Sequence, residues 1–201
     1  MSKQHSFYET TQKLNAREEN VKLYRELTGL QSIPPDRQYW TLAAEQRDTA
    51  TSEINQMLAL GLITSKAQFF GTDTVEWMIE KNKLVHPEAT WIHGEWEEVI
   101  AEYEPFNPGL LYLDTENLAG RITLNKTAAT MALCPVGAVL LLNVCQSSPY
   151  RAPMEADEFL QELSKRVPDI DLWVPSSGIR MFDYASNSTL MRTYCFHKRE
   201  Q

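Results

Sequence analysis

Two carboxylates follow two short extended stretches of the sequence, at the places where each stretch ends. Asp73 comes just after residues 68–71, and Glu95 comes just after residues 89–93, with a helical stretch over residues 75–84 between them. Parallel strands joined by a helix bring their carboxyl ends to one edge of a sheet, where open α/β folds bind ligands. Two carboxylates 22 positions apart on that edge suit the hydroxyls of a ribose and the edge of a base. The spacing therefore predicts a nucleoside-type pocket.

A third acidic residue, Asp114, follows the apolar run of residues 109–113 and begins a polar cluster with Thr115, Glu116 and Asn117. At the ligand edge it would act as an orienting acceptor or as a base for a substrate proton. Structural alternatives stay open for the other two acids. Asp73 also suits the cap of the helix that follows it. Glu95 also suits a first-turn carboxylate that the helix dipole favours.

Other reactive side chains give weaker signals. His86 and His93 flank a predicted strand without a third ligand at metal spacing, so we expect no metal site. The three cysteines lack metal-ligand spacing and are interpreted as buried small residues in a reduced interior. Tyr39 and Trp40 are expected in the core rather than as a base-stacking platform. Arg151, in the loop of residues 147–151, would either meet an anionic substrate or be solvated.

The elements that must position these residues follow a regular order. Residues 10–30 carry an amphipathic helix with Leu14, Val21, Tyr24 and Leu27 near 3.6 spacing, and Gly29 is a plausible stop. The two prolines at 34 and 35 force an extended segment. We therefore expect a helical extension over residues 1–37 and one α/β domain over residues 38–201.

Within that domain strands and helices alternate. Strands are expected at residues 39–44, 69–70, 90–92, 109–113 and 137–145, and helices at 52–60, 75–84, 118–133 and 156–167. The tail, residues 179–184 and 190–197, is predicted as a hairpin. This order predicts an α/β fold of Rossmann-like, doubly wound type, with a mostly parallel seven-stranded sheet and a C-terminal antiparallel hairpin.

This order of elements resembles the class I S-adenosylmethionine-dependent methyltransferases, from about residue 38 to the C-terminus. In that family an acidic residue at the end of the second strand holds the ribose hydroxyls, and Asp73 in GTD matches it. Glu95 in HGEW matches the acidic residue near the adenine. Asp114 in LLYLDTEN matches the acidic residue that faces the methyl donor or the substrate. The resemblance implies S-adenosylmethionine as cofactor and methyl transfer as the activity.

The first loop departs from the family pattern. There the family has glycines, because a backbone without Cβ can approach the cofactor closely, whereas residues 43–50 contain none. Glu45 would be the acidic residue that begins this loop, with Ala43 and Ala44 partly replacing glycine. The alternative is a loop closed by Gln46 and Arg47 over a lost pocket. Two functions follow: a methyltransferase of unknown substrate, or a non-catalytic protein-interaction module with the same fold.

Charge limits the partners. The net charge is −8, and residues 86–116 hold eight acidic residues and no Lys or Arg. Such a segment repels a phosphate backbone, so unaided nucleic-acid binding is expected to be weak, and a nucleic-acid substrate would need a partner subunit. The segment is either a solvated helix face or a surface for a basic protein partner. No apolar run is long enough to span a membrane, and no secretion signal begins the chain, so we expect a cytoplasmic protein.

Overall fold

A single sheet organises the computed structural model, which describes residues 11–146, 153–173, 180–186 and 189–200. Its strands lie in the order β3-β2-β1-β4-β5-β7-β6. The strands β3, β2, β1, β4 and β5 run parallel to one another. Strand β7 is antiparallel to both of its neighbours, β5 and β6. The strand bounds are, in sheet order, Thr90–His93, Phe69–Asp73, Gln38–Leu42, Pro108–Leu118, Val139–Cys145, Thr189–His197 and Arg180–Ser186. The mostly parallel sheet with a C-terminal antiparallel pair is thus confirmed.

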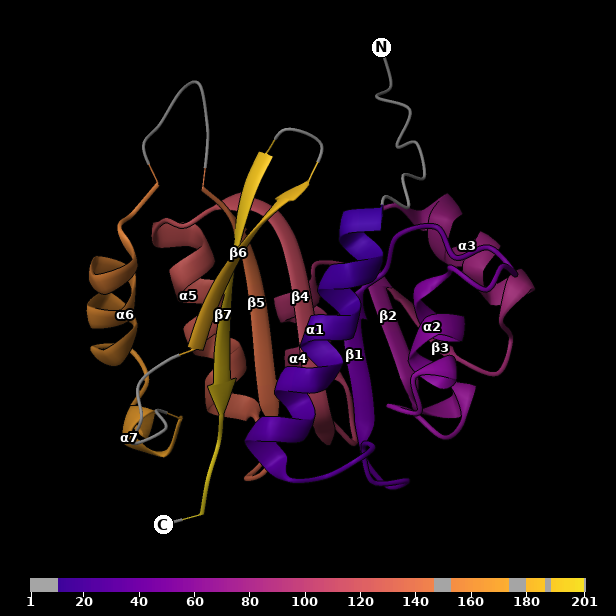
Figure 1. Ribbon diagram of the computed structural model, residues 1–201, viewed down its shortest axis with the longest axis horizontal. Coiled ribbons are helices and arrows are strands. Elements are labelled where there is room, and N and C mark those ends of the chain that lie inside the picture. Colours follow the sequence, from indigo (N-terminus) through magenta and orange to yellow (C-terminus); the bar gives the residue numbers. More distant parts are fainter. Residues whose placement is uncertain (1–10, 147–152, 174–179, 187–188, 201) are drawn as a thin grey trace.

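Helices cover both faces of the sheet (Figure 1). Helices α1 (Thr11–Thr28), α2 (Glu53–Ala59) and α3 (Glu76–Val85) bury apolar side chains against one face. Helices α4 (Trp96–Glu102), α5 (Arg121–Leu133), α6 (Ala156–Ser164) and α7 (Ile170–Trp173) cover the other. Central strand β5 is buried at every position, as a continuous apolar run predicts for a strand covered on both faces. The doubly wound, Rossmann-like arrangement follows.

Helix α1 is packed directly onto the sheet. Val21 and Tyr24, each 1% exposed, belong to the same core cluster as Tyr39 and Leu141. The helix runs opposite to the parallel strands, so its first turn lies at the edge where those strands end (Figure 1). The division of the chain at residue 37 stays a prediction, but the residues of α1 share a core with the sheet.

The main correction concerns the fourth strand. It was expected to end at Leu113, whereas β4 continues to Leu118 past a register shift after Asp114. Asp114 therefore lies inside the strand, opposite Asn143, and α5 begins at Arg121 rather than at residue 118. Asp and Asn disfavour strands, so the sequence suggested a stop. The hydroxyl of Thr115 donates to the carbonyl of Asn143 at 2.8 Å and holds the extension onto β5.

Other boundaries differ by a few residues. The sequence did not delimit α4, α7 or the short 3₁₀ helix of Lys66–Gln68. The loop containing Arg151 lies outside the described residues. No helix of the described part of the chain is long and apolar enough to cross a membrane.

Candidate functional site

The strand register places two of the predicted acids level with each other at the carboxyl edge. Leu42 of β1 pairs with Thr72 of β2, and the amide of Ala43 donates to the carbonyl of Thr72 at 2.9 Å. On the other side of β1, Thr41 pairs with Tyr112 of β4. Asp73 and Asp114 thus flank Ala43 on neighbouring strands. Two strand spacings separate them, roughly 10 Å.

Asp73 ends β2 in a short turn that holds its carboxylate in place. Its Oδ1 accepts a hydrogen bond from the amide of Val75 at 2.7 Å, and its carbonyl accepts one from the amide of Gly94 at 2.9 Å. The side chain is half-buried. The alternative that Asp73 caps α3 is not what the structure shows, because the N-cap is Val75 and has no side-chain cap. The turn leaves the carboxylate at the carboxyl end of β2.

Gly71 explains how β2 fits between its neighbours. A Cβ at this position would lie 2.5 Å from the Trp91 ring and 2.8 Å from the Cβ of Ala43. Ala43 is fully buried, so the beginning of the first loop packs directly against β2. The small residue that the sequence offered as a partial substitute for glycine is used here for strand packing.

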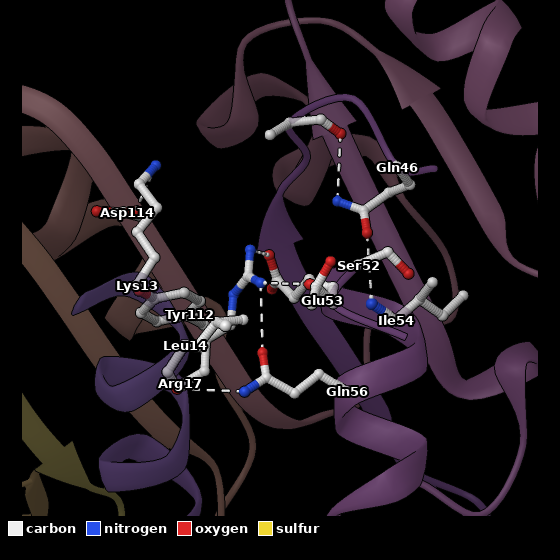
Figure 2. A network of polar contacts seen from close by, with 12 residues as sticks. Lys13, Leu14, Arg17, Gln46, Ser52, Glu53, Ile54, Gln56, Tyr112 and Asp114 are labelled. Carbon is white, nitrogen blue, oxygen red and sulfur yellow. Dashed lines mark hydrogen bonds and ion pairs between the residues drawn. The ribbon is translucent and has the colours of Figure 1, made fainter. Parts of the chain in front are cut away.

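The loop between β1 and α2 is filled by Gln46 (Figure 2). This residue is 1% exposed. Its Nε2 donates to the carbonyl of Ala44 at 3.3 Å, and its Oε1 accepts from the amide of Ile54 at 3.4 Å. Asn82 of α3, fully buried, accepts from the amide of Gln46 at 2.8 Å and donates to the carbonyl of Ala44 at 3.1 Å. Gln46 therefore occupies the interior of the loop, whereas the side chain of Arg47 is 53% exposed.

Glu45 is engaged in ion pairs at the outer side of this loop. Its Oε1 accepts from Nζ of Lys81 at 2.6 Å and from Nε of Arg47 at 3.2 Å. The hydrogen bond from Lys81 lowers the pKa of the Glu45 carboxyl, against burial, and the bond from Arg47 lowers it further. Glu45 stays ionised near neutral pH, with Lys81 tying the loop to α3.

Asp114 belongs to a polar network beneath the first turns of α1. Its Oδ1 accepts from Nδ2 of Asn143 at 3.2 Å, and the same nitrogen donates to the hydroxyl of Tyr112 at 2.9 Å. The hydroxyl of Thr193 donates to Oδ1 of Asn143, which fixes the orientation of the amide. Nζ of Lys13 lies 4.0 Å from Oδ2 of Asp114 (Figure 2). The Asp114 carboxylate is thus held in place by Asn143, and the ammonium group of Lys13 lies beside it.

Glu95 lies at the start of α4 and pairs with α5, the neighbouring helix in the same layer. Its Oε2 accepts from Nζ of Lys126 in α5 at 2.9 Å, and Glu97 also contacts that amine. Burial lowers the pKa of Lys126, but its hydrogen bonds to Glu97 and Glu95 outweigh burial and raise the pKa. Glu95 is the N-cap residue of α4 without a side-chain cap bond, so its side chain serves an ion pair instead.

Sequence reasoning missed a buried ion pair next to the loop. Nη2 of Arg17 in α1 lies 3.4 Å from Oε2 of Glu53 at the start of α2, and these side chains are 8% and 4% exposed. The hydroxyl of Tyr39 donates to Oε1 of Glu53 at 2.6 Å. The ion pair between Arg17 and Glu53 joins residues that are 36 positions apart in the sequence. No local pattern signals such a contact, because it exists only once α1 folds back over the sheet.

The aromatic residues of the first strand and the three cysteines lie in the core. Tyr39 and Trp40 are each 1% exposed, which confirms their place in the core. All three cysteines are free and buried, as expected, and burial raises the pKa of Cys134 to about 12. In the described ranges no group of three or more His, Cys, Asp or Glu residues is arranged to hold a metal ion.

Solved structures of similar architecture come from RNA-modifying and related proteins. Trm5b from Pyrococcus abyssi superposes with a TM-score of 0.58 at 12% identity, over 96% of this chain and 51% of that one. The M1A22 tRNA methyltransferase TrmK of B. subtilis gives 0.53 at 8% identity, over 88% and 65%. An rRNA methylase from Streptococcus thermophilus gives 0.52 at 14% identity, over 90% and 95%. The fold is methyltransferase-like.

These likenesses concern the fold alone. The chain spans 51% of Trm5b and 65% of TrmK, so about half to two thirds of those proteins' lengths. No family model and no curated protein matches the sequence. The comparisons confirm the methyltransferase-like Rossmann fold that the order of elements predicted, and leave the site to be argued from its own residues.

Proposed function

We propose that this chain is a methyltransferase-like protein that binds S-adenosylmethionine, or its demethylated product, along the carboxyl edge of the sheet. The observation that carries the proposal is the position of Asp73. It ends β2 beside β1, its Oδ1 is held by the amide of Val75 at 2.7 Å, and its side chain is half-buried. A fixed carboxylate at this strand end suits the two hydroxyls of a ribose.

The residues around the edge fit the cofactor unequally. The ribose end fits Asp73, and Glu95 at the next strand end is the proposed neighbour of the adenine. The methionine end meets a loop filled by Gln46, with Glu45 already paired to Lys81 and Arg47. S-adenosylmethionine supplies a methyl group when it is bound. For it to reach the edge, residues 44–49 have to move outward, and Glu45 then shares its charge between these cations and the ligand.

Asp114 is proposed to orient the acceptor. Its Oδ1 accepts a hydrogen bond from Nδ2 of Asn143 at 3.2 Å, and Nζ of Lys13 lies 4.0 Å from its Oδ2. An ionised carboxylate accepts hydrogen bonds and takes up a proton, so its role would be to align an N–H or O–H group of the substrate.

Calorimetry with the donor and its demethylated product tests the proposal. We expect heat of binding with the demethylated product for the wild type, and a loss of affinity of about tenfold or more for Asp73→Ala, because a hydrogen bond to a charged group is lost. Asp36→Ala is the matched control, since Asp36 is an exposed acid at the opposite edge of the sheet. Absence of heat with both ligands at millimolar concentration would refute donor binding.

A second candidate is a non-catalytic module that keeps the fold and binds a protein. The observation that favours it is the packed interior of the first loop, where Gln46 is 1% exposed. The substitution Gln46→Ala separates the two. If the loop opens for the donor, removing this side chain strengthens binding of the demethylated product. If the pocket is lost, neither the wild type nor Gln46→Ala binds it.

The partner of either form is proposed from charge. Residues 86–116 carry eight acidic residues without Lys or Arg, which suits a basic protein surface. Two of the similar proteins are a tRNA methyltransferase and an rRNA methylase, and an RNA acceptor is proposed here only together with such a partner. We expect no appreciable affinity of the isolated chain for random duplex DNA at physiological salt. A gel shift at submicromolar protein under those conditions would contradict this.

A further inference from the structure

The side of α1 that faces the sheet changes character along the helix. Along this side Lys13, Arg17 and Asn20 come before Val21 and Tyr24, and Ala16 is the buried apolar residue of the first half. The first half lies at the carboxyl edge of the sheet, where the parallel strands end (Figure 1). Arg17 and Asn20 are 7% and 5% exposed. A helix that only stabilised the fold would be expected to bury apolar side chains at this edge, so the buried Arg17 side chain calls for an explanation.

Arg17 reaches the beginning of α2 (Figure 2). Its Nη1 donates to the carbonyl of Thr51 at 3.2 Å and to Oε1 of Gln56 at 3.3 Å, and its Nη2 donates to Oε2 of Glu53 at 3.4 Å. Nε2 of Gln56 returns a bond to the carbonyl of Leu14 in α1 at 3.2 Å. Arg17 therefore holds the last residues of the loop and the first turn of α2 together.

Glu53 is held from two sides. Arg17 approaches one carboxylate oxygen from α1, and the hydroxyl of Tyr39 donates to the other from β1 at 2.6 Å. Separating a buried charge from its partner is costly, because the remaining charge has no water around it. By contrast, the earlier part of the loop is held by neutral hydrogen bonds of Gln46 and Asn82 and by ion pairs of Glu45 with Lys81 and Arg47. These two cations are about half exposed, so their pairs are worth less than the buried pair of Arg17 and Glu53.

Another arginine of α1 provides an internal comparison. Arg25 lies about two turns further along the helix. Its Nη2 donates to the carbonyl of Leu60 at 2.6 Å and its Nε to the carbonyl of Gln31 at 2.9 Å. Leu60 is the C-cap residue of α2. The two arginines thus fix opposite ends of α2, one at the carboxyl edge and one at the other edge.

We infer that α1 is a clamp on the loop between β1 and α2, and that Arg17 is the positioning residue that fixes residues 51–56. The segment that runs from the loop into the first turn of α2 then has two parts. Residues 44–49 can rearrange around a ligand, and residues 51–56 form a wall that stays in place. The part of this inference that concerns the donor rests on the proposed function. The clamp itself does not, because it is defined by contacts within the chain.

Amide hydrogen exchange of single-residue variants tests the clamp. In Arg17→Met we expect the amides of Ser52, Ile54 and Gln56 to exchange about tenfold faster or more than in the wild type, while those of Leu60 and Leu62 stay unchanged. Arg25→Met, the matched control, reverses the pattern. Equal acceleration at both ends in both variants, or no change at Ser52 and Ile54 in Arg17→Met, would overturn the inference.

A conservative variant covers the case in which Arg17→Met does not fold. Arg17→Lys keeps a cation near Glu53 but cannot reach three acceptors at once. The amides of Ser52 and Ile54 should still exchange faster, and unchanged rates in Arg17→Lys would count against the clamp.

Calorimetry with the demethylated product of S-adenosylmethionine tests the role at the donor site. If the wild type binds it, Arg17→Lys weakens binding by about fivefold or more and Arg25→Met leaves it unchanged. An equal loss in both variants would reject Arg17 as a positioning residue. If the wild type does not bind the product, the proposed function fails, and the exchange pattern still decides whether α1 clamps the loop.

Discussion

The turn after β2 and the loop after β1 lie on the same sheet edge but are held in different ways. The turn is short, and backbone amides of Val75 and Gly94 fix Asp73 with its carboxylate half-buried. The loop is longer, contains no glycine, and folds its own side chain, Gln46, into its interior. A short turn needs no filling, whereas a long loop without glycine has to pack its Cβ atoms and satisfy its buried amides.

For the donor proposed above, that difference separates the part of the edge that would take the ligand as it stands from the part that would have to move. The Asp73 turn presents an acceptor in a fixed position. The loop is stabilised as it stands by Asn82 of α3, Lys81 of α3 and Arg17 of α1. A ligand that needs both regions therefore has to offset the contacts of the first loop, which lowers its affinity in proportion to their strength.

The largest effect is expected from the buried pair that ends the loop. Glu53→Ala leaves the Arg17 charge buried without its carboxylate, and we expect a loss of about 3–5 kcal/mol in the free energy of unfolding. Denaturant unfolding followed by circular dichroism measures this. Glu80→Ala, which breaks an exposed pair with Lys83, is the control and should cost under about 1 kcal/mol. Similar losses in both variants would mean that the buried pair of Arg17 and Glu53 stabilises the fold no more than an exposed ion pair does.

A smaller effect is expected where α3 holds the middle of the loop. Asn82→Ala removes the acceptor of the Gln46 amide and a donor to the carbonyl of Ala44. We expect a loss of about 1–3 kcal/mol in the free energy of unfolding, since buried backbone groups lose their partner. Asn55→Ala is the control, because Asn55 also bonds within this loop, at 2.9 Å to the carbonyl of Thr49, but in an exposed position. If Asn82→Ala lowers the free energy of unfolding no more than Asn55→Ala does, Asn82 does not hold the loop.

The smallest effect should depend on pH. The pKa of Glu45 is lowered in the folded chain, chiefly by the hydrogen bond from Lys81, from an ordinary value of 4.5. Its ion pairs therefore stabilise the fold above that pH, and this contribution is lost as the pH falls through the folded pKa. Lys81→Met should lower the free energy of unfolding by up to about 1 kcal/mol at pH 7, because the lysine is half-exposed.

Unfolding curves at pH 7 and near pH 3 check this prediction. The difference between the wild type and Lys81→Met should shrink at the lower pH. Lys83→Met, which loses only an exposed partner in Glu80, serves as the control. A difference that stays constant or grows toward low pH would show that Lys81 acts through packing rather than through the Glu45 charge.

The sequence by itself determined the class of fold and the position of one strand end. Alternating strand and helix stretches and a terminal hairpin are local patterns, set by the period of apolar residues and by turn residues, so they are readable before folding. The end of β2 at Asp73 was predicted for the same reason, because the extended stretch there stops at a Gly-Thr-Asp turn sequence. The end of the fourth strand was missed, because Asp114 and Thr115 are held in it by contacts with Asn143 of another strand.

Only the tertiary structure decided which residues fill and hold the loop between β1 and α2 at the carboxyl edge of the sheet. The sequence offered Gln46 and Arg47 together as residues that close the loop, and only the structure shows Gln46 buried and held by Asn82, 36 positions away. Arg17 appears in the sequence as one more charge on an amphipathic helix, yet it is buried against Glu53, also 36 positions away. Pairs that are distant in the chain meet only after the helix layers have packed on the sheet. For that reason the residues that hold the first loop are visible in the structure and in no local pattern.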